Sequence, residues 1–256
     1  MRKLKYLVIL LIAWIYIQST IEPYPSIPVS HPNEKVSWGI GKVKEENGQP
    51  RDCVEANHTY TEYGATFVGS SEPIIYLTFD NGYENGNTHT ILDILKREDV
   101  QAVFFVTGDY AREEYDLIQR MIEEGHGIGN HSFKHLEYAS ISSEKRIEDL
   151  QKLHTLMEER YHYTMSLFRF PKGEYSIAAL QDIHASGYRT LFWSFAYYDY
   201  NIQDQPSNTT ALSKLNSGLH PGAIYLLHAV SDANMNVLEE FIQSAKAQGY
   251  TFALWV

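Results

Sequence analysis

The stretch TFDNGYENGNT, residues 78–88, directly follows the apolar run PIIYL at residues 73–77. A short apolar run bounded by turn residues indicates a buried strand, so Asp80 should lie at the carboxyl end of that strand. Further along, HSFKH at residues 131–135 carries two imidazoles four positions apart. On one side of a helical turn, both could bind one cation. A candidate general base and a candidate metal pair together indicate a hydrolytic site.

The chain around this stretch alternates between apolar runs and helical patterns. The runs expected to be strands cover residues 74–79, 102–107, 167–170, 190–193, 223–227 and 250–254, with a candidate short strand at 127–129. The helices expected between them have apolar residues at helical spacing within 91–95, 117–122, 147–161, 177–186 and 237–245, with Thr88 and Ser176 as N-caps. This alternation predicts an α/β fold with a parallel sheet covered by helices. Six or seven such units favour a closed or nearly closed (β/α) barrel.

Polar side chains follow five of the predicted strands, and in such barrels functional groups collect at the carboxyl ends of strands. These side chains are Asp80, His131, Arg169, Asp199 and His228. Taken singly, each has a structural explanation, such as a turn cap, a surface or core histidine, or a structural ion pair. Their shared position at the carboxyl ends of strands favours a catalytic role over these structural explanations. His228 would be a general acid, Arg169 would hold a neighbouring carboxylate ionised, and Asp199 would orient His228.

The amino terminus has the pattern of an export signal. Arg2, Lys3 and Lys5 precede the uncharged residues 6–17, a run too short for a standard membrane span. The cleavage site at residues 18–20 is weak, so residues 1–20 are expected to be either a signal peptide or an uncleaved anchor. Residues 21–70 would be a proline-rich linker and an extension that wraps the main domain, residues 71–256. The protein is therefore expected at the cell wall or on the outer face of the membrane. Only residues 1–20 are expected to contact the membrane.

Composition narrows the class of ligand. The net charge of −11 argues against nucleic-acid binding, which needs a basic surface. Aromatic residues make up 13% of the chain, and tyrosine suits sugar binding, although most of the 19 tyrosines are expected in the core. The single cysteine, Cys53, cannot form an intrachain disulfide. A buried or free thiol and a dimer through Cys53 both remain open.

Taken together, these residues resemble the polysaccharide deacetylases, which are also called the NodB-homology family or carbohydrate esterase family four. The resemblance covers about residues 72–256. The family's five motifs are met in order by TFDN at 78–81, HSFKH at 131–135, RFP at 169–171, DY at 199–200 and LLH at 226–228. The resemblance implies a distorted barrel of about seven strands, a divalent metal that is usually zinc, and hydrolysis of N-acetyl groups on amino-sugar polymers.

The family roles transfer to matching positions of this chain. The resemblance implies that Asp80 is the base, His228 the acid, Arg169 and Asp199 their respective partners, and His131, His135 and Asn81 the metal ligands. Most members have aspartate at the position of Asn81, so a weak metal site is expected. Tyr200 replaces the usual tryptophan and would wall the acetyl pocket, to which Leu226 would also contribute.

The longer motifs point to one branch of the family. TFDNGYENG, HPGAIYLLH at residues 220–228 and SWG at residues 37–39 resemble the peptidoglycan N-acetylmuramic acid deacetylases, which start muramic δ-lactam formation in spore cortex. The substrate would be peptidoglycan glycan strands, with Lys172 as the candidate cation for the lactyl carboxylate. Two alternatives are an N-acetylglucosamine or chitooligosaccharide deacetylase and a non-catalytic module that binds wall glycan.

Overall fold

The computed structural model describes residues 32–256. The expected signal or anchor and most of the proline-rich linker lie outside the described residues. Within residues 32–256, no helix is both long and apolar enough to cross a bilayer.

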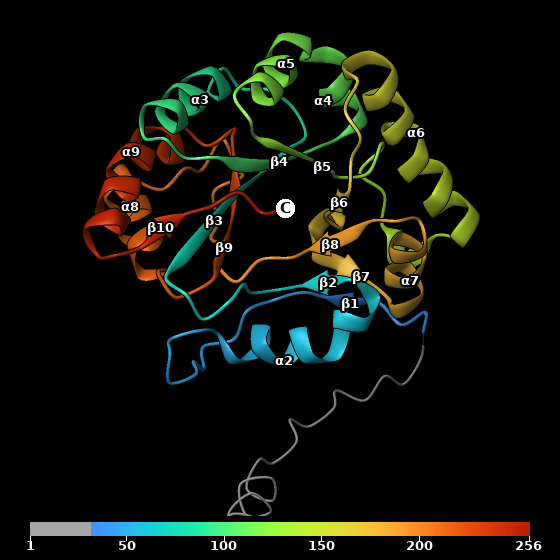
Figure 1. Cartoon of the computed structure of the whole chain (residues 1–256), viewed down its shortest axis with the longest axis horizontal. Helices are drawn as coiled ribbons and strands as arrows, with labels where there is room; N and C mark the ends of the chain where they lie inside the picture. Colours follow the sequence, from blue (N-terminus) through green and yellow to red (C-terminus); the bar gives the residue numbers. More distant parts are fainter. Residues whose placement is uncertain (1–31) are drawn as a thin grey trace, which may run out of the picture.

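A curled sheet of eight strands forms the centre of the molecule (Figure 1). Seven of them pair in the order β10-β3-β4-β5-β6-β8-β2, and the eighth, β9, also pairs with β3. Every ladder in this sheet is parallel. The strands are β2 (Ala65–Thr66), β3 (Ile74–Asn81), β4 (Ala102–Val106), β5 (Gly127–Asn130), β6 (Leu167–Phe168), β8 (Arg189–Leu191), β9 (Ala223–His228) and β10 (Thr251–Phe252). All seven predicted strands are present, and β2 is an eighth strand that the sequence did not predict.

The chain beyond β8 reaches β9 at the other end of the sheet, as expected for a nearly closed barrel. β8 ends at Leu191, and four residues later Phe195 forms an isolated parallel bridge to Tyr225 of β9. The N–H of Ser194 also donates to the carbonyl of Ile224, at 3.0 Å. Because all strands run the same way, their carboxyl ends lie at one rim of this curled sheet.

Helices cover the outside of the sheet (Figure 1). They are α2 (Arg51–Tyr60), α3 (Thr88–Arg97), α4 (Gly108–Glu113), α5 (Tyr115–Glu123), α6 (Ser143–Tyr161), α7 (Ile177–Ala185), α8 (Asn208–Ser217) and α9 (Asp232–Ala247). Helices were predicted at α3, α5, α6, α7 and α9, whereas α2, α4 and α8 were missed. Ser176 caps α7 as expected, but Asn87 rather than Thr88 is the N-cap of α3. Within the predicted apolar stripe of α6, Ile147 is 40% exposed.

Residues 36–66 pack onto the open side of the barrel. β1 (Val36–Ser37) pairs antiparallel with β7 (Glu174–Tyr175), and β2 extends the main sheet beside β8. The Trp38 indole N–H donates to the carbonyl of Trp193, at 3.0 Å. Cys53 on α2 is fully buried, and burial raises the pKa of its thiol. A dimer through Cys53 is therefore incompatible with the folded chain.

Candidate active site

A cavity of about 600 Å³ opens among the residues at the carboxyl ends of the strands. Its walls include seven of the predicted site residues, namely Asp80, His131, His135, Lys172, Tyr200, Leu226 and His228. Four further lining residues were not predicted, namely Gly173, Trp193, Ala196 and Tyr197. Trp193 ends a predicted strand, and that position was the available signal for it.

Asp80 and Arg169 form a buried ion pair. Asp80 is the seventh residue of β3 and lies opposite His228 of β9 in the ladder. Its Oδ1 accepts a hydrogen bond of 2.9 Å from a guanidinium nitrogen of Arg169. Burial alone would raise the pKa of Asp80, but His131 and His228 when protonated, and the charge and hydrogen bond of Arg169, lower it below the ordinary value. Since His131 is itself neutral near pH 7, Arg169 is the fixed cation that keeps Asp80 ionised.

Arg169 is held by several acceptors, so its position is fixed. Besides Asp80, it donates to Thr78 Oγ1 at 2.8 Å, to the Leu191 carbonyl at 2.9 Å and to the Phe192 carbonyl at 3.2 Å. The side chain is completely buried. A buried guanidinium needs this number of acceptors to offset its loss of hydration.

His131 presents an unprotonated ring nitrogen to Asp80. Its Nδ1 lies 3.0 Å from the carbonyl oxygen of Arg169, which can only accept, so Nδ1 carries the proton. The lone pair of Nε2 then faces Asp80 Oδ2 at 3.5 Å. Burial lowers the pKa of His131 to about 4, and it also lowers the pKa of His135. The ring of His135 lies 5.1 Å from that of His131.

The segment that carries both histidines is a loop, so the predicted helical turn is wrong. Ser132 and His135 have φ values of 68° and 54°, a left-handed conformation that side chains other than glycine seldom adopt. The buried carboxylate of Asp149 on α6 holds this loop by accepting four hydrogen bonds of 2.7–3.1 Å. The donors are Ser132 Oγ, the N–H groups of Phe133 and Lys134, and the Tyr138 hydroxyl.

Asn81 ends β3 beside Asp80, and its amide is fully buried without lining the cavity. The Tyr110 hydroxyl lies near this amide, but no hydrogen bond of normal geometry joins them. Within residues 32–256, no group of three or more His, Cys, Asp or Glu side chains is arranged as a metal site. The neutral imidazoles of His131 and His135 line the cavity and suit a divalent metal, whereas the unpaired amide of Asn81, also a suitable donor, is buried outside the cavity lining. A site built from these three residues would carry little charge of its own.

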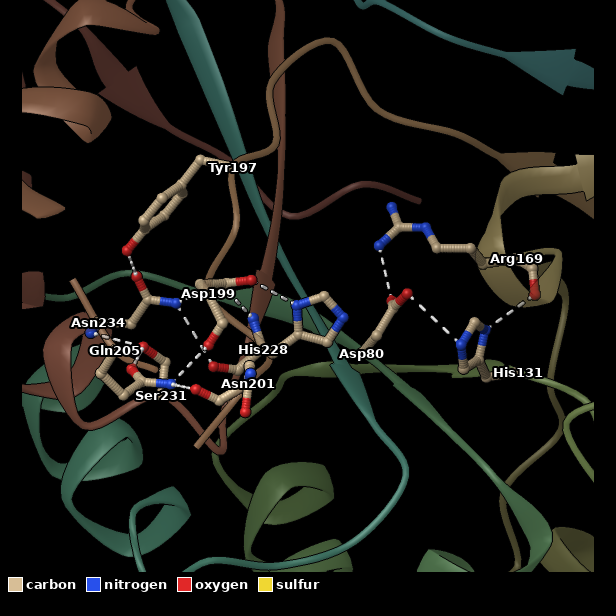
Figure 2. A network of polar contacts seen from close by, with 10 residues as sticks. All are labelled: Asp80, His131, Arg169, Tyr197, Asp199, Asn201, Gln205, His228, Ser231 and Asn234. Atoms are coloured by element: carbon tan, nitrogen blue, oxygen red, sulfur yellow. Dashed lines mark hydrogen bonds and ion pairs between the residues drawn. The ribbon is translucent and has the colours of Figure 1, made fainter. Parts of the chain in front are cut away.

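Asp199 and His228 form the second pair of the site. His228 Nδ1 lies 2.7 Å from Asp199 Oδ1, and the N–H of His228 donates to Asp199 Oδ2 at 2.9 Å. Burial lowers the pKa of His228, but the hydrogen bond and charge of Asp199, with the charge of Asp80, together raise it above its ordinary value. Figure 2 shows the His228 ring between Asp199 on one side and Asp80 on the other.

Asp199 is supported by residues that the sequence does not predict (Figure 2). Asn234 Nδ2 donates to Asp199 Oδ2 at 2.6 Å, and its Oδ1 accepts from the Tyr197 hydroxyl. Gln205 Nε2 donates to the Asp199 carbonyl at 3.0 Å, while its Oε1 accepts from Ser231. Ser231 is the N-cap of α9, which places Asn234 in its first turn. That capping pattern is visible in the sequence, but nothing there connects it with Asp199.

Lys172 and Tyr200 lie at the mouth of the cavity. Lys172 Nζ donates to Glu137 Oε1 at 2.8 Å, and this pair is exposed. Tyr200 is 55% exposed and its ring lies edge-on to His228, with centroids 5.6 Å apart. Leu226 is nearly buried in the wall. The cavity therefore has a polar floor and a partly aromatic rim.

Comparisons with known proteins agree with this geometry. Residues 68–191 match the family model described as polysaccharide deacetylase. The peptidoglycan-N-acetylmuramic acid deacetylase PdaA of Bacillus subtilis is 41% identical over 227 residues, covering 86% of this chain and 84% of that protein. A peptidoglycan-N-acetylglucosamine deacetylase of Bacillus cereus is 31% identical over 195 residues, covering 75% of this chain and 91% of that protein.

The fold comparison leads to the same group. The solved structure of Bacillus subtilis PdaA, described as a family 4 carbohydrate esterase, superposes with a TM-score of 0.83 at 38% identity. The match covers 88% of this chain and 96% of that one. Sequence, fold and the paired Asp80–Arg169 and Asp199–His228 groups agree, and the chain belongs to the polysaccharide deacetylase family, carbohydrate esterase family 4.

Proposed function

We propose that this protein hydrolyses the N-acetyl group of N-acetylmuramic acid in peptidoglycan and releases acetate. The observation that carries the proposal is one cavity that joins an ionised carboxylate to an imidazole of raised pKa, Asp80 and His228. Amide hydrolysis needs a group that takes a proton from water and a group that gives one to the leaving amine. The similarity to PdaA of Bacillus subtilis supports muramic acid as the sugar.

The proposed reaction starts with a water molecule next to Asp80. Asp80 takes a proton from this water as its oxygen bonds to the acetamide carbon, and the carbonyl electrons move onto the carbonyl oxygen. A backbone N–H near Lys172 would donate to that oxygen. The electrons on that oxygen then re-form the carbonyl bond as the C–N bond breaks, and His228 gives its proton to the departing nitrogen. The products are acetate and a free amino sugar.

Deacetylases of this family depend on a metal in general. In this chain His131, His135 and Asn81 would hold a divalent ion, for which zinc is our proposal. The bound ion supplies positive charge that polarises the acetamide carbonyl. With only neutral ligands, the affinity for the ion would be low.

The freed amine has a partner on its own sugar. N-acetylmuramic acid carries a lactyl carboxylate, and once the acetyl group is removed, amine and carboxylate can condense to a lactam with loss of water. We therefore place the reaction at the start of muramic δ-lactam formation in spore cortex, with the protein exported to the wall or the outer face of the membrane. The similarity to the N-acetylmuramic acid deacetylase PdaA supports muramic acid as the sugar on which this first step acts.

Mass spectrometry of peptide-free glycan, before and after incubation with the protein, tests the proposal. Loss of one acetyl mass from muramic acid residues is the expected result. Loss from glucosamine residues instead would favour the alternative that the Bacillus cereus relative represents. A folded protein that releases no acetate from any glycan, with or without added zinc, would favour the non-catalytic alternative.

A further inference from the structure

A second cavity, of about 780 Å³, lies beside the catalytic one. The two cavities share Ala196 and Tyr197 in their linings, so the segment that carries Asp199 runs between them. The other walls come from the amino-terminal extension between residues 40 and 50, from residues 204–206, and from α8 together with the residues that follow it up to His220. The reaction proposed above places no reacting group in this cavity, although Tyr197 and Gln205 of its lining belong to the network that supports Asp199.

Three lysines without an acidic partner line the second cavity. Five lysines of the described part of the chain are paired with carboxylates, namely Lys35, Lys96, Lys134, Lys172 and Lys246. Five others in that part are not, and three of these, Lys42, Lys44 and Lys214, line this one cavity. The only acidic side chain among its lining residues is Asp204. In a chain of net charge −11, such a local excess of positive charge favours an anionic ligand.

The remaining walls suit a sugar. Phe195, Tyr197 and Tyr198 contribute aromatic rings, and Tyr198 is 49% exposed. Ring faces cover the C–H groups of sugars, and the Tyr198 hydroxyl, which accepts from Asn201, can donate to a sugar oxygen, whereas the Tyr197 hydroxyl donates to Asn234. His220 adds no charge, because burial lowers its pKa to about 4 and its ring nitrogens lie within hydrogen-bond distance of Gly218 and Ser194. The positive charge of the cavity therefore comes from the lysines alone.

From these observations we infer that the second cavity binds a carboxylate-bearing part of the same glycan strand whose acetylated sugar occupies the catalytic cavity. This inference rests on the proposed function for the identity of the strand. Two parts of the strand could supply this carboxylate. One is the lactyl group of another muramic acid further along the strand, and the other is a peptide attached to the strand. The site would make the enzyme prefer glycans longer than one disaccharide, or glycans that carry peptide.

The test compares three substrates with a charge-reduced variant, Lys42→Gln/Lys44→Gln/Lys214→Gln. The substrates are a peptide-free disaccharide with one muramic acid, a peptide-free hexasaccharide with three, and a disaccharide that carries its peptide. We expect the variant to raise KM for the hexasaccharide about tenfold relative to the disaccharide, with kcat within about twofold of the unsubstituted protein. A rise confined to the peptide-bearing disaccharide would assign the site to peptide carboxylates instead. Equal KM ratios in both proteins, for both comparisons, would overturn the inference.

A charge-matched variant, Lys96→Gln/Lys145→Gln/Lys246→Gln, controls for the change in net charge, because its lysines lie away from both cavities. Added salt should reduce the preference of the unsubstituted protein for the hexasaccharide, since exposed charges are screened. A binding measurement separates this inference from the proposed function. In the inactive background His228→Gln, calorimetry with the hexasaccharide should show about tenfold weaker binding after loss of the three lysines. If acetate release fails but this difference holds, the site stands and the proposed reaction falls.

Discussion

Asp199 holds His228 at two points, through the ring Nδ1 at 2.7 Å and through the backbone N–H at 2.9 Å. The first contact raises the pKa of the imidazole. The second fixes the position of the His228 backbone, from which the ring projects. Asn234 in turn donates to Asp199 from α9. The acid of the proposed reaction is therefore tuned and positioned by one buried carboxylate.

This relationship predicts a pH effect for Asp199→Asn. His228 must be protonated to act as an acid, and Asp199 raises its pKa, so removing that charge lowers the pKa. Activity should then be lost at lower pH than in the unsubstituted protein, which is a shift of the upper limb of the kcat/KM profile towards acid. The profile is measured from about pH 5 to 9 on peptide-free glycan. Asp232→Asn, at an exposed position on α9, should leave the limb in place. If the upper limb of the profile does not move in Asp199→Asn, the limb reports the pKa of a group other than His228.

Asp80→Asn should reduce acetate release by about 10²–10⁴-fold, because an amide cannot accept the proton of water. It should also lower the free energy of unfolding by about 3–5 kcal/mol, because Arg169 stays fully buried without its counter-charge. Steady-state kinetics and urea unfolding measure the two effects. Turnover at the unsubstituted level in the folded variant would remove Asp80 from the mechanism.

Asn81→Asp should bind zinc about tenfold more tightly or better. A carboxylate adds a full negative charge near two neutral imidazoles, and the amide it replaces makes no hydrogen bond of normal geometry. Isothermal calorimetry with zinc on both proteins, at one pH, gives the comparison. Equal affinities would mean that residue 81 is not a ligand.

Asp149→Asn should weaken zinc binding about 10- to 100-fold, since the loop that carries His131 and His135 would lose its shared acceptor. Asp182→Asn is the matched control. Asp182 of α7 accepts hydrogen bonds from Ser143 and Arg146 on α6, the helix that carries Asp149, but it does not contact the histidine loop. Both variants should unfold at lower temperature. Only Asp149→Asn should lose zinc affinity in the folded state, and equal affinities in the two variants would reduce Asp149 to a structural role.

Lys172→Ala should raise KM for peptide-free muramyl glycan about two- to fivefold and leave KM for a glycan without the lactyl group nearly constant. Lys172 lines the cavity but is paired with Glu137 at 2.8 Å, so a substrate carboxylate would have to compete with Glu137. Glu137→Gln should therefore lower KM for the muramyl glycan. If both substrates respond equally to Lys172→Ala, the lysine acts on the loop and not on the choice of sugar.

The sequence by itself determined the strands of the sheet and the polar residues at their ends. Apolar runs such as residues 102–106 are buried on both faces, and such runs are recognisable because covering helices remove water from both sides. The cavity-lining positions of Asp80, His131 and His228 followed from strand ends alone. Because all strands of the sheet are parallel, residues at their carboxyl ends must lie at the same rim of the barrel.

Only the tertiary structure decided what surrounds those residues. The left-handed loop at Ser132 and His135 depends on Asp149 from another helix, so local spacing wrongly indicated a helical turn. Asn234 reaches Asp199 from 35 positions away, and β2 joins the sheet beside β8 from outside the predicted barrel. A single hydrogen bond or a two-residue strand leaves almost no periodic trace in a sequence. Such contacts exist because the closed core brings their partners together, and that closure is a property of the whole chain.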